Sequence, residues 1–180
     1  MKHKIFVSIE IPEKTRVKLI QTREKWKDLP VKWVKDPNLH LTLAFLGFVE
    51  EEAISEIYSR VDSAVRENGI FDIEMDEIKI FPSPEQPQAI ALTGQANEAL
   101  KNLVNDLEEN LGLSESKKKI YRPHITLGRI RVHKWEALDQ EPIIMEKFPV
   151  IITADAVNIM ASRFGEKNNV YTIVESCPLK

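Results

Sequence analysis

A histidine and a threonine two residues apart occur twice in this chain, as His40 with Thr42 and as His124 with Thr126. Each pair stands in a short apolar run that is typical of a β-strand, where residues two apart share a face. Strict alternation places Phe45 with the apolar residues on the other face. A single pair would be read as a structural histidine. Packing alone does not require the same two polar residues in both copies.

Two imidazoles that face one cleft suit the displacement of an oxygen at phosphorus. Histidine ionises near pH 6.5, so one ring can take a proton from water while the other gives one to the leaving oxygen. The threonine hydroxyls can donate to the non-bridging oxygens as charge builds in the transition state. The residues alone do not say which histidine is the acid and which is the base.

The elements that must position these pairs recur along the chain. The apolar pattern predicts a first strand over 5–11 and a strand over 71–80 whose alternation slips by one residue, as at a β-bulge. The same slip occurs over 150–159. Helices are predicted over 13–27, 51–66 and 96–111.

This order predicts an α+β fold of two pseudo-symmetric lobes, each an antiparallel sheet with helices on its outer face and the active-site cleft between them. The repeat units run over about 38–112 and 120–180, with residues 1–29 completing the second. Together they form a single bilobal domain over 1–180. The proline-rich segment 81–87 is expected to be a loop.

Composition limits the partners and the compartment. The net charge of −3 excludes a polycation that binds nucleic acid through its overall charge. The single cysteine, Cys177, cannot form a disulfide within the chain and fits a reducing cytoplasm. The N-terminus lacks the apolar block of a signal peptide, and no stretch is long enough to span a membrane. We therefore expect a cytoplasmic protein without membrane contact, and a monomer.

No metal ion or cofactor is expected. The sequence has no His-Glu-x-x-His motif, no paired cysteines and no cluster of acidic residues that would suggest a metal site. It also has no glycine-rich loop of the kind that cradles a nucleotide phosphate.

The segments 38–47 and 122–129 resemble those of the two-histidine phosphoesterase superfamily, and within it the LigT-like RNA 2′,3′-cyclic phosphodiesterases. The resemblance covers nearly the whole chain and includes Phe6, Trp33 and the strand of Tyr171. It implies metal-independent hydrolysis of a 2′,3′-cyclic phosphate to a 2′-phosphate end.

The resemblance also implies roles and partners. His40 would be the proton donor to the 3′ oxygen and His124 the base on water, with Thr42 and Thr126 on the phosphate oxygens. The partners would be RNA with 2′,3′-cyclic phosphate ends, including tRNA halves produced in tRNA processing, or small cyclic nucleotides.

Further residues are candidates for substrate binding. Arg129 matches a family arginine that could touch phosphate, but strict alternation turns it away from His124 unless the strand bends at Gly128. Phe48 and Trp33 could stack a base, as aromatic residues do for single-stranded RNA, although core packing would also explain either one.

The most basic part of the chain lies between residues 114 and 134 and contains the second pair. A local positive field favours an anionic ligand. Its candidate contacts to phosphate or to the RNA backbone are Lys117, Lys118, Lys119 and Arg122. A solvated surface loop is the alternative explanation for the three lysines.

Two other functions fit the same cleft. One is a non-catalytic RNA-binding or nucleotide-binding module, which would bind in a salt-dependent way without turnover. The other is an RNA end-joining (2′-5′ ligase) activity, the reverse reaction at the same site. The retained histidine pair argues against the binding module, because lysine or arginine would serve binding equally well.

Overall fold

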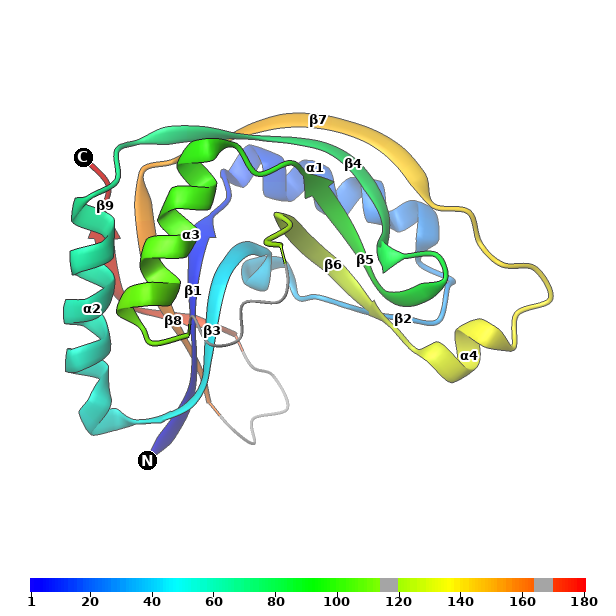
Figure 1. Cartoon of the computed structure of the whole chain (residues 1–180). Coiled ribbons are helices and arrows are strands. Elements are labelled where there is room, and N and C mark those ends of the chain that lie inside the picture. Colours follow the sequence, from blue (N-terminus) through cyan, green and yellow to red (C-terminus); the bar gives the residue numbers. More distant parts are fainter. Residues whose placement is uncertain (114–119, 164–169) are drawn as a thin grey trace.

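The computed structural model describes residues 1–113, 120–163 and 170–180, and these residues form two antiparallel sheets (Figure 1). Sheet A has the strand order β3-β1-β8-β9. Its strands are β1 (Lys2–Glu10), β3 (His40–Glu50), β8 (Ala156–Arg163) and β9 (Thr172–Pro178). Sheet B has the order β2-β6-β5-β4-β7. Its strands are β2 (Val31–Trp33), β4 (Phe71–Ser83), β5 (Gln86–Gly94), β6 (His124–Ile130) and β7 (Met145–Ala154).

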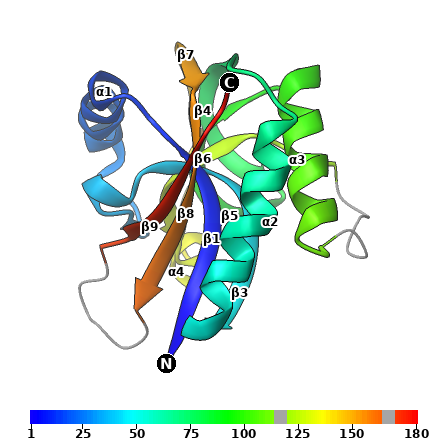
Figure 2. The same cartoon turned by 90° about the vertical axis from the view of Figure 1, so that its left-hand side faces the viewer.

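Helices cover sheet A on the side away from sheet B. Helices α2 (Ile54–Arg66) and α3 (Glu98–Asn110) lie together on this face, as Figure 2 shows. Both are amphipathic because their apolar residues recur at helical spacing, and Val61 and Leu103 are fully buried. The side chain of Asn97 caps α3 by accepting a hydrogen bond from the Leu100 amide at 2.9 Å.

Sheet B packs against the first helix of the chain. Helix α1 (Glu13–Arg23) places the Lys18 ammonium 4.8 Å from the centre of the Phe148 ring on β7. The 3₁₀ turns η1 (Glu24–Trp26), η2 (Asp36–Asn38) and η3 (Glu51–Ala53) and the short helix α4 (Val132–Glu136) complete the described elements. The predicted α+β class with two lobes is therefore confirmed.

The two sheets exchange strands between the predicted repeat units. Strand β3 of the unit 38–112 pairs with β1 in sheet A, whereas β4 and β5 of the same unit pair in sheet B with β7 and β6. The boundary between the units is thus not the boundary between the sheets. In sheet A, the order β3-β1-β8 repeats the order β6-β5-β4 of sheet B, so β1 occupies the position that β5 has.

One of the two predicted phase slips is a bulge and the other is a crossing point. In β4 the pairing register shifts between Met75 and Glu77, as the sequence predicted. The predicted single strand over 150–159 is wrong, because residues up to Ala154 belong to β7 in sheet B and those from Ala156 to β8 in sheet A. The chain passes from one sheet to the other at Asp155.

A local twofold axis relates the two halves at the pairing of β4 with β7. Ile73 lies opposite Ile152, and both are fully buried. Phe71 pairs with Ala154 and Met75 with Val150, so the pairs are symmetric about these two isoleucines. This pairing joins the two repeat units through their core.

The segment 81–87, expected to be a loop, is mostly strand. Strand β4 continues to Ser83 and β5 begins at Gln86, which leaves a turn of two residues. Prolines are tolerated near this hairpin end because few ladder hydrogen bonds remain to be made there. As a result Phe81 stands on a strand, with its side chain half-buried.

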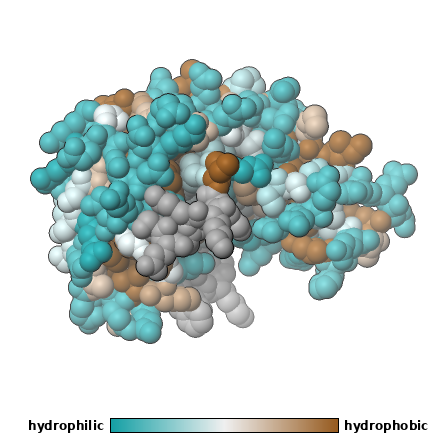
Figure 3. All heavy atoms as spheres, viewed as in Figure 1, coloured by the Kyte–Doolittle hydropathy of each residue, from teal (hydrophilic) through white to brown (hydrophobic). Residues whose placement is uncertain are grey.

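The outer surface is mainly polar. Figure 3 shows hydrophilic residues over most of one face, with hydrophobic residues in separate patches. Within the described part of the chain, no helix has the length and apolar character needed to cross a bilayer.

Candidate active site

The backbone holds the two histidines in the same way at the starts of β3 and β6. The Nδ1 atom of His40 lies 2.5 Å from the carbonyl oxygen of Asn38, and that of His124 lies 2.8 Å from the carbonyl oxygen of Arg122. A carbonyl oxygen can only accept, so Nδ1 carries the hydrogen in both neutral rings. In each ring Nε2 is therefore the nitrogen that can exchange a proton with a ligand.

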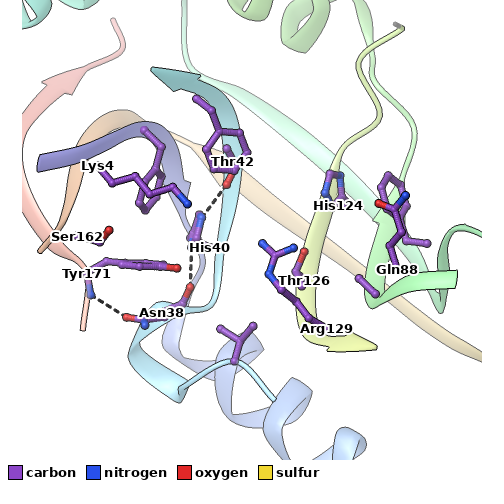
Figure 4. A pocket seen from close by; sticks show the side chains of 15 residues that line it. Lys4, Asn38, His40, Thr42, Gln88, His124, Thr126, Arg129, Ser162 and Tyr171 are labelled. Carbon is purple, nitrogen blue, oxygen red and sulfur yellow. Dashed lines mark hydrogen bonds between the residues drawn. The ribbon is translucent and has the colours of Figure 1, made fainter. Parts of the chain in front are cut away.

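Both rings line one cavity of about 200 Å³ between the sheets, as Figure 4 shows. The four predicted site residues His40, Thr42, His124 and Thr126 all contribute to its wall. Pockets that enclose a drug-sized ligand measure roughly 300–1,000 Å³. This cavity therefore suits a phosphate with part of its sugar, while the rest of a nucleotide would lie against the surface outside.

A β-bulge follows each threonine and decides which later residues reach the cleft. The pairing of β3 with β1 contains one extra residue, Leu43, and that of β6 with β5 contains one extra residue, Leu127. An extra residue reverses the face to which the following side chains point. Phe45 and Arg129 therefore line the cavity, which corrects the expectation from strict alternation that both face the other way.

Phe45 and Arg129 occupy equivalent positions, each three residues after its threonine, but differ in chemistry. Arg129 brings a positive charge toward the two histidines from the sheet B side (Figure 4). Phe45 is 58% exposed, and its ring centre lies 6.0 Å from that of Phe6. The histidine and threonine framework is thus symmetric, whereas these two equivalent positions carry a cationic side chain in sheet B and an aromatic one in sheet A.

Aromatic rings pack against both imidazoles. The Phe81 ring stacks on His124 with centres 4.0 Å apart and an angle of 17° between the planes. Phe6 lies 4.8 Å from His40, and Tyr171 meets His40 edge-on at 5.6 Å. These contacts fix the ring planes and remove water from one side of each ring.

Burial lowers the pKa of both histidines below the usual 6.5. For His40, desolvation is the main cause, and the positive charges of His124 and Arg129 add to it. For His124, desolvation again leads, with Arg122 and Arg129 adding. The hydrogen bonds to the carbonyl oxygens act in the opposite direction. Both rings are therefore mainly neutral at pH 7 until a bound anion favours their protonation.

The sequence did not identify several residues of the cavity wall. Lys4, Gln88 and Ser162 line it from three different strands. Asn38 is buried, and its Oδ1 accepts a hydrogen bond from the Tyr171 amide at 2.8 Å, which fixes the turn whose carbonyl holds His40. These four residues lie far apart in sequence and share no motif.

The remaining predicted contacts are less direct. The Arg122 guanidinium lies 4.9 Å from the centre of the Phe81 ring and donates to the Pro82 carbonyl oxygen at 3.3 Å. It thus supports the ring that stacks on His124 and is not among the described cavity-lining residues. Lys117, Lys118 and Lys119 lie outside the described residues.

Neither aromatic candidate forms part of the cavity wall. Trp33 on β2 is partly buried against the core and packs over Gly128 of the neighbouring strand β6. The contact is so close that a Cβ added to Gly128 would lie 2.7 Å from Cε3 of Trp33. Phe48 is 58% exposed on β3, beyond the cavity. In residues 1–113, 120–163 and 170–180, no three or more His, Cys, Asp or Glu residues cluster in a way that could hold a metal.

The fold and the cleft define a class: a two-sheet antiparallel α+β protein with a histidine and threonine pair from each half facing one cavity. Residues 9–91 match the family model described as LigT like Phosphoesterase. An RNA 2′,3′-cyclic phosphodiesterase of Methanocaldococcus jannaschii is 31% identical over 129 residues, which cover 71% of this chain and 72% of that protein. The chain belongs to the LigT-like phosphoesterase family.

Longer matches agree with this assignment. An RNA 2′,3′-cyclic phosphodiesterase of Thermotoga maritima is 28% identical over 179 residues, covering 96% of this chain and 93% of that one. The crystal structure of Escherichia coli LigT complexed with 3′-AMP has a TM-score of 0.80 and 25% identity, with 99% of each chain covered. A Thermus thermophilus crystal structure shares the fold, with a TM-score of 0.81 and 23% identity over 98% of this chain and 97% of that one.

Proposed function

We propose that this protein hydrolyses the 2′,3′-cyclic phosphate ends of RNA to 2′-phosphate ends, with His40 and His124 as acid and base and no metal ion. One observation carries the proposal: each Nδ1 is fixed by a carbonyl oxygen, so in both rings Nε2 is the nitrogen left to exchange a proton at one shared cavity. In His40 this nitrogen also contacts the Thr42 hydroxyl. The names of the relatives given above support the choice of substrate.

In the proposed reaction His124 Nε2 takes a proton from water as the water oxygen attacks phosphorus. The bond from phosphorus to the 3′ oxygen breaks, and this oxygen takes the proton from Nε2 of protonated His40. The product carries a 2′-phosphate and a free 3′ hydroxyl. The two rings have then exchanged protonation states, and proton transfer with solvent restores them.

The charge that develops on the phosphate is stabilised by groups that are already in place. Arg129 faces the cavity, and the Thr126 hydroxyl lies on the same strand. On the other side, Thr42 Oγ1 lies 2.7 Å from His40 Nε2, so the hydroxyl and the ring can share one phosphate oxygen. The strands hold these groups in place, and only the Thr42 hydroxyl, which donates to Nε2 of the neutral His40 ring, must turn toward the phosphate.

The difference between Phe45 and Arg129 supports His40 as the acid. An exposed aromatic ring on the sheet A side favours stacking of the nucleobase there, which brings the ribose near His40. The leaving 3′ oxygen belongs to this ribose. Water would then approach from the sheet B side, where His124 is available as the base.

The test is to incubate the protein, with EDTA present, with an oligonucleotide that ends in a 2′,3′-cyclic phosphate, and to identify the product. We expect a 2′-phosphate end in wild type, and a loss of about 10²-fold or more in rate for His40→Ala and for His124→Ala with the fold intact. RNA binding without turnover would support a binding module instead. A joined 2′-5′ linkage from two RNA ends would support end-joining.

We also propose that one chain is sufficient. Both histidines, both threonines and Arg129 come from the same chain, so the site needs no second copy. Light scattering should give the mass of a monomer at the concentrations used for activity. The single cysteine, Cys177, is buried and suits a reducing cytoplasm, which we propose as the location.

A further inference from the structure

On sheet A, a row of side chains continues from the cavity along β3. A second bulge, at Leu46, shifts the pairing of β3 with β1 again, and Gly47 beside it has a φ of 78°. The second reversal brings Phe48 back to the face that carries Phe45. Both phenylalanines are 58% exposed, so neither ring is used to fill the core.

Lys4 lies beside this row, on the neighbouring strand β1. It pairs with Phe48 on β3 and with Ser162 on β8, and it lines the cavity together with Phe45. In Figure 4 its side chain lies on the same side of the cleft as His40. Among the described residues no carboxylate forms an ion pair with Lys4, and none lines the cavity.

A lysine beside two exposed aromatic rings, with no carboxylate paired to it among the described residues, has the chemistry of a single-stranded nucleic acid site. Bases stack on such rings whatever their sequence, and a lysine at this position can meet the phosphate between two of them. The row is continuous with the cavity, so a strand whose last phosphate occupies the cavity would lie along it.

We propose that Lys4 and Phe48 form a subsite for the second nucleotide from the RNA end, an inference that rests on the proposed function. Phe48 stacks the base of this nucleotide, and Lys4 contacts the phosphate that joins it to the terminal nucleotide. The terminal base lies on Phe45. The protein therefore acts on the ends of RNA chains in preference to cyclic mononucleotides.

The test compares kcat/KM for a mononucleotide 2′,3′-cyclic phosphate with that for a trinucleotide with the same end. Wild type should favour the trinucleotide by about tenfold. Phe48→Leu and Lys4→Ala should each lower this ratio severalfold, whereas Phe48→Trp should keep it. Lys4→Ala should also weaken the salt dependence of the trinucleotide reaction. Lys101→Ala, an exposed lysine on α3, is the matched control and should leave the ratio unchanged.

Equal kcat/KM for both substrates in wild type, or equal losses for both in the variants, would overturn the subsite while leaving the proposed function in place. Turnover of neither substrate would overturn the proposed function and the subsite with it. A dimer in wild type that becomes a monomer in Phe48→Leu would also overturn it, because edge strand β3 would then be a contact between copies.

Discussion

At the scale of single residues, the chemistry depends on which nitrogen of each imidazole is left to exchange a proton. In each ring, Nδ1 donates its hydrogen to the carbonyl oxygen of the residue two positions earlier. This residue is Asn38 for His40 and Arg122 for His124. The neutral form is favoured in both rings by burial and by Arg129. The same arginine would attract the phosphate, whose negative charge raises the pKa of the ring that must act as acid.

The lowered pKa values predict the pH dependence of the reaction. The active free enzyme has one ring protonated and the other neutral, and this form is most abundant midway between the two pKa values. Because both lie below 6.5, kcat/KM should follow a bell with its maximum below pH 6.5. Steady-state rates between pH 4.5 and 8.5 would measure it (these limits span about two units on either side of 6.5). A maximum above pH 7 would contradict it.

Arg129→Gln should raise the pKa of both His40 and His124. The guanidinium opposes protonation of both rings, and glutamine removes the charge while keeping hydrogen-bonding groups. NMR titration of the imidazole carbon-bound protons reports each ring separately. Arg131→Gln, which removes an exposed charge from the end of the same segment, should leave both values in place. Unchanged values in Arg129→Gln would show that this side chain does not reach the cleft.

At the scale of elements, strands bring these residues together through two bulges, at Leu43 and Leu127, that strict alternation did not predict. The apolar patterns predicted the helices α1, α2 and α3 and strands β1, β3 and β6. The bulge in β4 was visible as a slip in the alternation, but Leu43 and Leu127 were not predicted as extra residues, because the small residues Ala44 and Gly128 that follow them obscure the alternation. This is why Phe45 was expected in the core and Arg129 on the opposite face. The sequence did not identify Phe81 as a site residue, because the prolines that follow it in the segment 81–87 suggested a loop.

Gly128→Ala should destabilise sheet B. The added Cβ would lie 2.4 Å from Val31 Cγ1 and 2.7 Å from Trp33 Cε3, so strand β2 must move away from β6. Overpacking of this kind costs about 1–3 kcal/mol in the free energy of unfolding, which urea titration measures. Adding Val31→Ala should recover part of the loss in the double variant. Stability equal to wild type in Gly128→Ala would mean that β2 and β6 are less tightly packed than described.

At the scale of the whole molecule, the exchange of strands between the sheets ties the lobes into one unit. The sequence repeat correctly predicted two lobes. It did not predict which strand belongs to which sheet, because this depends on the crossing at Asp155 and on pairing between strands far apart in the sequence. Local patterns carry no record of such pairing. The histidines and threonines could be chosen from sequence because the motif is repeated, whereas Lys4 and Tyr171 reach the cavity only in the assembled fold.

Tyr121→Phe should weaken the connection between the lobes. The Tyr121 hydroxyl donates to the carbonyl oxygen of Thr42 at 2.8 Å, which links the segment before β6 to β3 of the other sheet. Burial raises the pKa of this phenol, so it remains a donor at neutral pH. We expect a loss of about 1 kcal/mol in the free energy of unfolding. Tyr58→Phe on α2 is the control, and equal stabilities of the two variants would contradict the role.

The central claim is that the two histidines act as acid and base on a single phosphorus atom. The most direct measurement uses a 2′,3′-cyclic substrate in which sulfur replaces the 3′ oxygen, because a thiolate leaves without being protonated. His40→Ala should regain most of its lost rate on this substrate, whereas His124→Ala should remain slow on both. Equal recovery of both variants, or full activity of either variant on the natural substrate, would contradict the account.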